Sequence, residues 1–596
     1  MMRIQRIQLQ KWALTAALTL SMVGCASTKT EKVFTKVDSE LQGVAQNSES
    51  TPQAPEKDKG DAPAEAKRPV SKPVPATLAK RSRRKVSQAL GGARPGNAPA
   101  DGLKSNYLRD EEPPIITEEK RVTPHNTEDY DRIYENPFLN SHTNPLSTFS
   151  IDVDTASYSN IRRYIENNQL PPADAVRIEE LVNYFPYDYA APEGNRPFAI
   201  HTDLAVCPWQ PDHKLLRIGL KGKPVKTENL PANNLVFLLD VSGSMSNPNK
   251  LPLLKRSLKL LVDRMREQDH VSIVVYAGAA GVVLPPTSGE NKDLIIKALD
   301  KLNAGGSTAG GAGIQLAYKL AQTHFKANGN NRIILATDGD FNVGPSSDAA
   351  LTRMIEEKRK AGIFLTVLGF GMGNYKDNKM EKLADKGNGN YAYIDNLTEA
   401  RKVLVTEMGS TLLTLAKDVK LQLEFNPTRV KEYRLIGYEN RMLRTEDFND
   451  DTKDAGELGA GTTVTALYEI VPGNASTEVP LKYQQQENRT SAALSNELLT
   501  VKLRYKAPQA DKSQLMTNTV KDAPLRWEKA PRDFRFAAAV ANFGMQLRDS
   551  KHRGNWSFED VITQARSSQG DDMESYRQNF VNLARQAQLL KQTQTR

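Results

Sequence analysis

Between residues 231 and 412, apolar runs alternate with stretches in which apolar residues recur at helical spacing. The first apolar run is NLVFLLD at 234–240, and further runs begin near 271, 281, 332 and 364. Helical spacing is present from Leu254 to Met265 and around 313–325, 349–360 and 379–386. Strands that alternate with helices form a parallel sheet with helices on both faces. We therefore predict an α/β domain over 231–412, built on a doubly wound, mostly parallel sheet.

The segments on either side carry other patterns. Residues 126–230 contain STFSIDVDTASYSNIRRYI, which predicts a short strand and a helix capped near 154–157, followed by a second helix that ends at Phe185. We expect a smaller N-terminal α+β region there. Apolar and polar residues alternate over 419–425, 464–470 and 499–505. This alternation predicts half-buried strands of an antiparallel sandwich, which is expected to include strands from 195–225.

The end of the chain is helical in pattern. Two apolar stripes at helical spacing are expected to pack in a core: Phe536, Val540, Phe543 and Leu547, and Met573, Tyr576, Phe580, Leu583, Ala584 and Ala587. Together with the strands before them, they predict a β-sandwich-plus-helices region over 413–596.

The pattern of the first 125 residues does not predict a folded domain. Basic residues precede an apolar stretch from Trp12 to Val23, which is too short to span a bilayer and has the layout of an export signal over 1–24. The run from Met22 to Cys25 resembles the bacterial lipobox, which implies that Cys25 carries lipid such as palmitate and becomes the mature N-terminus. Residues 25–125 are rich in Pro, Ala, Lys, Glu and Ser without apolar periodicity, so we expect a disordered tether.

The residues after Cys25, the net charge and the cysteine count bear on the cellular location and the partners. By resemblance to proteobacterial lipoproteins, Ala26 and Ser27 imply an outer-membrane protein of the bacterial cell envelope that faces the periplasm. The net charge of +9 would suit nucleic acid in the cytoplasm, but export removes that partner and leaves the membrane, reached through the lipid anchor. With Cys25 lipidated, Cys207 stands alone, and its apolar neighbours predict a core residue without a disulfide.

Oxygen-bearing side chains gather where two predicted strands end. Asp240 closes the first strand of the α/β domain, Ser242 and Ser244 follow at alternate positions, and Asp338 closes the strand that begins near 332. Ligands of such sheets lie beyond the carboxyl ends of the strands. The loop GGSTAGG between them adds Thr308. Two carboxylates and three hydroxyls suit a hard divalent cation such as Mg²⁺, which takes oxygen ligands.

The pattern DxSxS, then Thr308, then Asp338 in TDG resembles the metal-ion-dependent adhesion site of von Willebrand factor type A domains, whose fold is Rossmann-like. The resemblance implies that Ser242 and Ser244 bind the metal directly, and that Asp240, Thr308 and Asp338 bind it directly or through water. It further implies Mg²⁺, Mn²⁺ or Ca²⁺ as the metal. The open coordination position would take an exposed acidic side chain of a partner protein.

Longer stretches resemble one family. SIDVDTASYSNIRRYI and RIEELVNYFPYDY before the domain, ATDGDFNVG and DKGNGNYAYIDN within it, and VKLQLEFNPTRVKEYRLIGYENR after it are similar to the bacterial YfbK-type lipoproteins. That family combines a small N-terminal region, a type A domain and a C-terminal region of unassigned role. The resemblance therefore implies the fold more than the biochemical function.

The predicted function is a metal-ion-dependent protein-binding module, of adhesion type, on an envelope lipoprotein. Two alternatives stay open: a structural envelope scaffold whose metal only ties loops together, and a divalent-metal hydrolase. The hydrolase needs a base, for which Asp340 is the sequence-near candidate, although we expect Asp340 to be a turn residue. Walker, HExxH and GxSxG motifs do not occur in the sequence, so no enzyme activity is expected.

Asp152 and Asp154 alternate along a strand in the manner of a catalytic carboxylate pair. We attribute them to helix capping and backbone hydrogen bonding instead. Ala156 stands where the Asp-Thr-Gly loop of aspartic proteases has glycine, and no second copy of the motif is found.

Overall fold

The computed structural model describes residues 127–226, 230–307, 310–339, 341, 348–407, 412–475 and 490–594, all within the unit Ile116–Arg596. The predicted export signal, Cys25 and the tether lie outside the described residues, and so do Thr308 and Asp340. Among the helices that are described, none combines the length and the apolar character needed to cross a membrane.

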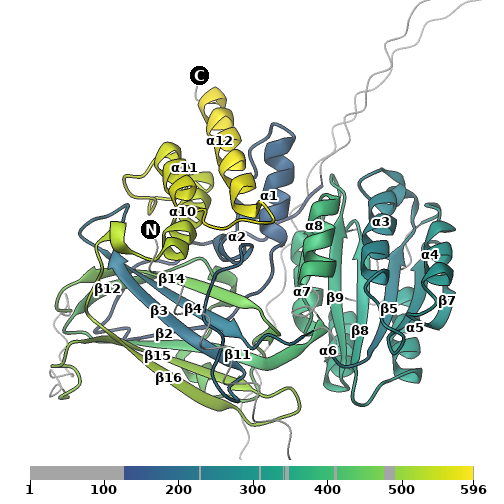
Figure 1. The fold of residues 1–596 in the computed structure, drawn as a ribbon, viewed down its shortest axis with the longest axis horizontal. Helices are drawn as coiled ribbons and strands as arrows, with labels where there is room; N and C mark the ends of the chain where they lie inside the picture. The colour runs from purple at the N-terminus through teal and green to yellow at the C-terminus, as the bar shows by residue number, and fades with distance from the viewer. Residues whose placement is uncertain are drawn as a thin grey trace, which may run out of the picture. The chain divides into compact units, whose positions relative to one another are not determined.

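A six-stranded sheet forms the centre of the α/β domain in the described part of the chain (Figure 1). Its order is β10-β9-β8-β5-β6-β7, and only β6 and β7 run antiparallel. The strands are β5 (Asn233–Asp240), β6 (His270–Tyr276), β7 (Ala280–Ser288), β8 (Asn330–Thr337), β9 (Ile363–Phe370) and β10 (Tyr391–Ile394). The predicted doubly wound, mostly parallel sheet is confirmed, with one antiparallel strand at its edge.

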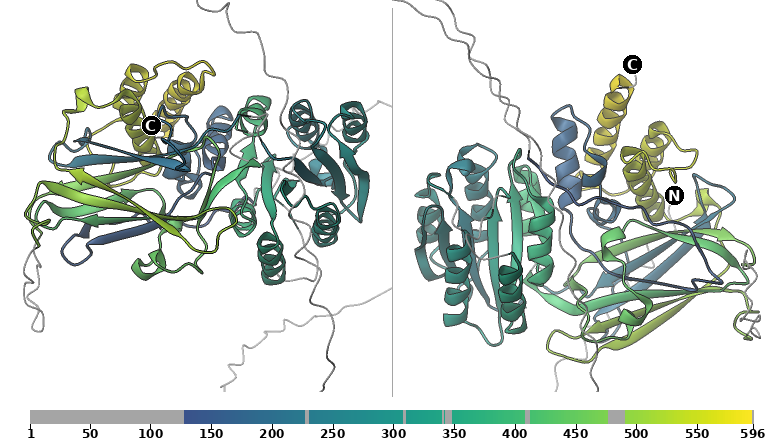
Figure 2. Two further views of the ribbon diagram at one scale, coloured as in Figure 1. Left: turned by 60° about the horizontal axis from the view of Figure 1, so that its bottom comes forward. Right: turned by 180° about the vertical axis from the view of Figure 1, so that it is seen from behind.

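Helices cover both faces of this sheet (Figure 2). One face carries α3 (Leu251–Val262), α4 (Lys292–Asp300) and α8 (Leu397–Arg401), and the other carries α5 (Gly310–Thr323), α6 (Asp348–Lys360) and α7 (Asp377–Lys386). Side chains along β5 alternate between the two cores, since Phe237 packs with the α3 side and Leu238 with the α5 side. The elements α4, α8 and β10 were not predicted from the sequence.

Two antiparallel sheets make up the sandwich. One has the order β1-β12-β14-β4-β3, and the other has the order β13-β11-β15-β16, with β2 also paired to β11. The strands from residues 126–230 are β1 (Leu139–Asn140), β2 (Leu146–Ser150), β3 (Phe198–Val206) and β4 (Lys214–Gly222). Those from residues 413–596 are β11 (Thr414–Phe425), β12 (Val430–Ile436), β13 (Gly456–Gly459), β14 (Thr463–Pro472), β15 (Glu497–Lys506) and β16 (Gln514–Lys521).

Strands from both flanking regions therefore share sheets. β4 pairs with β14, and β2 pairs with β11, so segments separated by the whole α/β domain lie side by side. The expectation that strands from 195–225 join the sandwich is confirmed. The facing sides of the two sheets bury one apolar core that includes Phe149, Leu421 and Tyr468.

A fourth core lies among helices that precede the α/β domain and helices near the end of the chain. These are α1 (Ala156–Glu166), α2 (Ile178–Asn183), α10 (Arg532–Leu547), α11 (Phe558–Ser567) and α12 (Tyr576–Gln594). Phe580 packs against Phe185 and Phe536, and Cys207 is buried here as predicted. The predicted place of Met573 in the second stripe is wrong, because this residue precedes α12 and is 97% exposed.

The predicted cap of α1 is also wrong in its chemistry. The helix begins at Ala156, close to the expected position, but its N-cap residue Thr155 makes no side-chain capping hydrogen bond. Asp152 and Asp154 point to other partners, which belong to a buried cluster described below.

Candidate metal centre

The first predicted site residues lie where β5 and β8 end. Asp240 is the last residue of β5, Ser242 and Ser244 follow it in the next loop, and Asp338 comes directly after β8. β5 and β8 are parallel neighbours, so their carboxyl ends meet at the same edge of the sheet. The fold thus places all four side chains at one edge.

Asp240 is held by hydrogen bonds from three directions. One carboxylate oxygen, Oδ1, accepts from the backbone N–H of Ser242 at 2.9 Å. The other, Oδ2, accepts from the hydroxyls of Thr337 at 3.2 Å and Tyr276 at 3.3 Å. The side chain is fully buried, and burial raises the pKa of Asp240 to about 6. The hydrogen bonds from Ser242 oppose this shift, whereas the charge of Asp338 adds to it.

The two serine hydroxyls bridge the two carboxylates. Ser242 Oγ lies 3.0 Å from Ser244 Oγ, and the Ser244 side chain hydrogen-bonds Asp338. The loop that precedes Thr308 is tied to the same place, because the backbone N–H of Gly243 donates to the carbonyl of Gly306 at 3.0 Å. Asp240, Ser242, Ser244 and Asp338 are therefore brought together, and Thr308 lies outside the described residues.

Lys250 is a member of this site that the sequence analysis missed. Its Nζ donates to Asp338 Oδ2 at 2.8 Å and to Asn374 Oδ1 at 3.2 Å. Burial by itself raises the pKa of Asp338, but the hydrogen bond and the positive charge of Lys250 outweigh it and leave that pKa below its usual range. Lys250 precedes the first residue of α3, a position where the apolar pattern gives no signal for an inward-pointing charge.

The residues present fit a hard divalent cation. Carboxylates and hydroxyls are oxygen ligands of the kind that Mg²⁺, Mn²⁺ and Ca²⁺ prefer, and here they converge from two neighbouring strand ends. The glycine at 339, with φ +103°, turns the chain immediately after Asp338 in a conformation that other residues rarely adopt. Among the described residues, the ammonium of Lys250 on Asp338 works against a metal.

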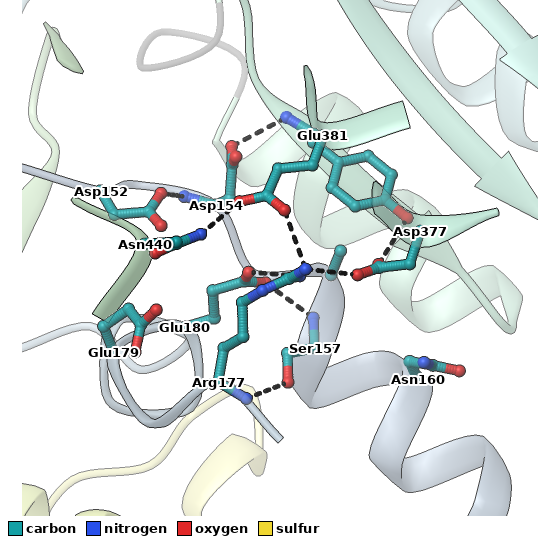
Figure 3. A network of polar contacts seen from close by, with 12 residues as sticks. Asp152, Asp154, Ser157, Asn160, Arg177, Glu179, Glu180, Asp377, Glu381 and Asn440 are labelled. Carbon is teal, nitrogen blue, oxygen red and sulfur yellow. Dashed lines mark hydrogen bonds and ion pairs between the residues drawn. The ribbon is translucent and has the colours of Figure 1, made fainter. Parts of the chain in front are cut away.

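A second polar cluster lies between α2 and α7 (Figure 3). Three of its buried carboxylates, Asp152, Glu180 and Glu381, have oxygens within 4.8 Å of one another and could hold a metal ion. Two guanidinium groups already contact them. Arg177 lies 3.1 Å from Glu180 and 2.8 Å from Glu381, and Arg441 lies 3.1 Å from Asp152 and 3.3 Å from Glu381.

This cluster joins three parts of the chain. Arg177 precedes α2 and also pairs with Asp377 of α7 at 2.6 Å, while Arg441 from the sandwich side pairs with Asp385 at the end of α7 at 2.7 Å. Carboxylates outnumber guanidiniums, and burial raises the pKa of Glu381 to about 7 and that of Glu180 well above its usual range.

Asp152 and Asp154 belong to this cluster, which corrects their assignment as helix caps. Asp154 Oδ1 accepts from the backbone N–H of Tyr391 at 2.8 Å, and both aspartates contact Arg441. Their predicted backbone hydrogen bonding is present, since Asp152 Oδ1 accepts from the N–H of Asp154 at 3.0 Å. Nothing local in the sequence signals an arginine nearly three hundred residues away.

Comparison with known proteins places the chain in a family. Residues 234–406 match the von Willebrand factor type A domain, residues 124–217 match the family described as von Willebrand factor, and residues 410–590 match the family described as uncharacterized protein YfbK, C-terminal. The uncharacterized protein YfbK of Escherichia coli (strain K12) is 46% identical over 464 residues, which cover 76% of this chain and 80% of that protein. The chain belongs to the YfbK family.

Other relatives of this YfbK-family chain share less of it. The uncharacterized protein sll0103 of Synechocystis sp. is 29% identical over 185 residues, which cover 31% of this chain and 43% of that protein. The solved structure titled von Willebrand factor type A from Catenulispora acidiphila has a TM-score of 0.35 and 17% identity, covering 66% of this chain and 90% of that one. The predicted type A fold and the predicted YfbK membership are confirmed, and the matched families carry no enzyme description.

Proposed function

We propose that the type A domain of this YfbK-family chain binds a protein partner through a divalent cation. Asp240, Ser242, Ser244 and Asp338 would hold the ion, with Thr308 completing the set. The supporting observation is the meeting of these oxygens at one sheet edge, although the serines and Asp338 are more than ninety residues apart in sequence. Mg²⁺ is the first candidate, with Mn²⁺ and Ca²⁺ next.

The bound metal would supply a Lewis-acidic coordination position for an anionic ligand. The ligand class that suits it is an exposed Asp or Glu side chain on the partner, because a carboxylate is a hard oxygen donor. The chain's own residues orient the ion and neutralise part of its charge. The partner is accordingly expected to present an acidic loop or terminus.

We further propose that the domain works in the bacterial envelope, anchored by lipid on Cys25 and facing the periplasm from the outer membrane. Replacing Cys25 with serine is expected to release the protein from the membrane fraction and to abolish incorporation of labelled palmitate. Membrane association that survives Cys25→Ser would remove the lipid anchor from the proposal.

The binding function is tested by capture from envelope extract on the immobilised full chain. The arms are wild type with Mg²⁺, wild type with chelator, Asp338→Ala with Mg²⁺, and Ser246→Ala with Mg²⁺ as a matched control. Ser246 lies in the same short helix as Ser244 and is exposed like it, but it is not one of the proposed ligands. A protein retained by wild type and Ser246→Ala with Mg²⁺, and by neither of the other arms, is the expected result.

The same experiment separates the alternatives. Identical captures in all arms would contradict a metal-bridged function and would move partner binding to the flanking regions, with a structural role for any metal. If the metal is structural, chelation is expected to lower thermal stability well beyond the mass-action contribution of a bound ligand. A screen of the Mg²⁺-loaded protein for hydrolytic turnover tests the third alternative, whose candidate base Asp340 lies outside the described residues.

A further inference from the structure

Lys250 enters the proposed metal site as an internal cation. Its Nζ lies 2.8 Å from Asp338 Oδ2, and the two side chains are 4% and 0% exposed. Asn374 Oδ1 accepts a second hydrogen bond from the same ammonium at 3.2 Å. A lysine is rarely buried without a specific partner, so the pairing with Asp338 is a built feature of the site.

The surrounding backbone makes room for this side chain. Gly371 adopts φ +78°, and a Cβ atom at that position would lie 2.2 Å from Lys250 Cε. The Lys250 chain therefore passes directly over the backbone of Gly371 on its way to Asp338. Any larger residue at 371 would push the ammonium away from the carboxylate.

The ammonium of Lys250 changes the net charge of the site. Asp240 and Asp338 together carry two negative charges when ionised, and Lys250 cancels one of them. A divalent cation then leaves the loaded site with one positive charge, whereas the same site without the lysine would be neutral. The lysine repels the entering metal and competes for an Asp338 oxygen, but its charge also attracts an anion to the loaded site.

We propose that Lys250 determines the ligand preference of the metal site, weakening its hold on the divalent ion while keeping the loaded site positive for a carboxylate ligand. This inference rests on the proposed function. It predicts that metal affinity and anion affinity change in opposite directions when the ammonium is removed. A merely structural lysine would leave both affinities unchanged or lower both.

The test uses the full chain and Mn²⁺ alone as the first probe, with affinity measured by electron paramagnetic resonance of free Mn²⁺. Lys250→Met removes the charge at similar length. Lys259→Met is the control on α3, the helix that Lys250 immediately precedes, and Lys259 pairs with Asp300 at the surface. Lys250→Met is expected to bind Mn²⁺ at least about tenfold more tightly than wild type. Lys259→Met is expected to match wild type.

The second readout is acetate binding to the Mn²⁺-loaded proteins, followed by water-proton relaxation as acetate displaces metal-bound water. Wild type is expected to bind acetate at least about threefold more tightly than Lys250→Met. Lys250→Gln, which keeps a hydrogen-bond donor, repeats both measurements, and circular dichroism establishes that each variant is folded.

The outcomes are distinguishable. If wild type binds no Mn²⁺, the proposed function itself fails. If wild type binds Mn²⁺ and the folded Lys250 variants bind it equally or more weakly, the inference is overturned while the metal site stands. The inference is likewise overturned if loaded Lys250→Met binds acetate as tightly as loaded wild type.

Discussion

The guanidinium of Arg177 lies 2.8 Å from Glu381 Oε2, with both side chains more than nine-tenths buried. Arg177 belongs to the N-terminal flanking region and Glu381 to α7 of the type A domain. The pair therefore links the domain that carries the candidate metal centre to the part of the chain that shares its sheets with the C-terminal region. Its surroundings are rich in carboxylates, which makes the link sensitive to protonation.

The free energy of unfolding is expected to fall as the pH rises from 5.5 to 8.5. Burial raises the pKa of Glu381 and of Glu179 to about 7 in the folded chain, above the value of about 4.3 for an unfolded glutamate. The folded state therefore binds more protons, and the stability present below about pH 4.3 is lost as the pH rises through 7. Denaturant unfolding at several pH values measures this trend.

Glu381→Gln imitates the protonated form and isolates that residue's share. The variant is expected to show a flatter pH profile and a smaller stability loss at pH 8 than wild type. A wild-type stability that rises with pH over this range, or a Glu381→Gln profile parallel to wild type, would contradict the assignment.

Arg177→Met is expected to destabilise the protein strongly. The change leaves Glu180, Asp377 and Glu381 without their shared guanidinium, and breaking a buried pair in this way costs on the order of 3–5 kcal/mol. Lys382→Met is the matched control, because Lys382 pairs with Asp131 at the surface and its loss should not measurably change the denaturation midpoint. Equal midpoints for both variants would show that the buried cluster does not stabilise the junction.

Asp240→Asn is expected to lower Mn²⁺ affinity by more than about tenfold while keeping the fold. The amide oxygen still accepts from the backbone N–H of Ser242, so the loop geometry is retained while one ligand charge is lost. Removal of a buried carboxylate whose pKa is raised to about 6 should also leave the stability at pH 7 equal or higher. Asp263→Asn, at the far end of α3, is the control for metal titration.

Gly371→Ala and Gly373→Ala separate steric conflict from backbone strain. Both glycines have φ between +70° and +95°, but only at 371 would a Cβ meet the Lys250 side chain. Each alanine is expected to cost about 1–2 kcal/mol for the left-handed conformation, with a further loss at 371. In a Lys250→Ala background the further loss at 371 should disappear while the loss at 373 stays the same, as measured by thermal unfolding of each glycine variant and its parent in both backgrounds.

Phe580→Ala is expected to cost about 3–5 kcal/mol, because this fully buried ring packs among Phe185, Phe536 and Phe543. Met573→Ala is the control from the same predicted stripe, and its 97% exposed side chain should leave the denaturation midpoint unchanged. A comparable loss in both variants would contradict the boundary of the C-terminal core at Tyr576.

Helical and strand periodicity correctly predicted most elements of the α/β domain. Each of its strands and amphipathic helices is a contiguous segment whose burial follows its own period. Helical spacing also predicted Met573 in a core stripe that in fact begins at Tyr576, because spacing alone does not locate the end of a helix. Asp154 was predicted as a helix cap, because a local sequence pattern contains no information about Tyr391 and Arg441, the partners that the fold supplies.

The candidate site likewise contains residues that the sequence predicts and residues that only the fold brings in. The motif residues Asp240, Ser242 and Ser244 lie within five positions, and their meeting with Asp338 follows from the rule that neighbouring parallel strands end at one edge. No such rule predicts the position of Lys250 or the polar cluster between α2 and α7. Only the packing of the whole chain decides the direction of a side chain at a helix start and the contacts between segments hundreds of residues apart. The reason is that a buried charge needs an opposite charge nearby or a proton that neutralises it.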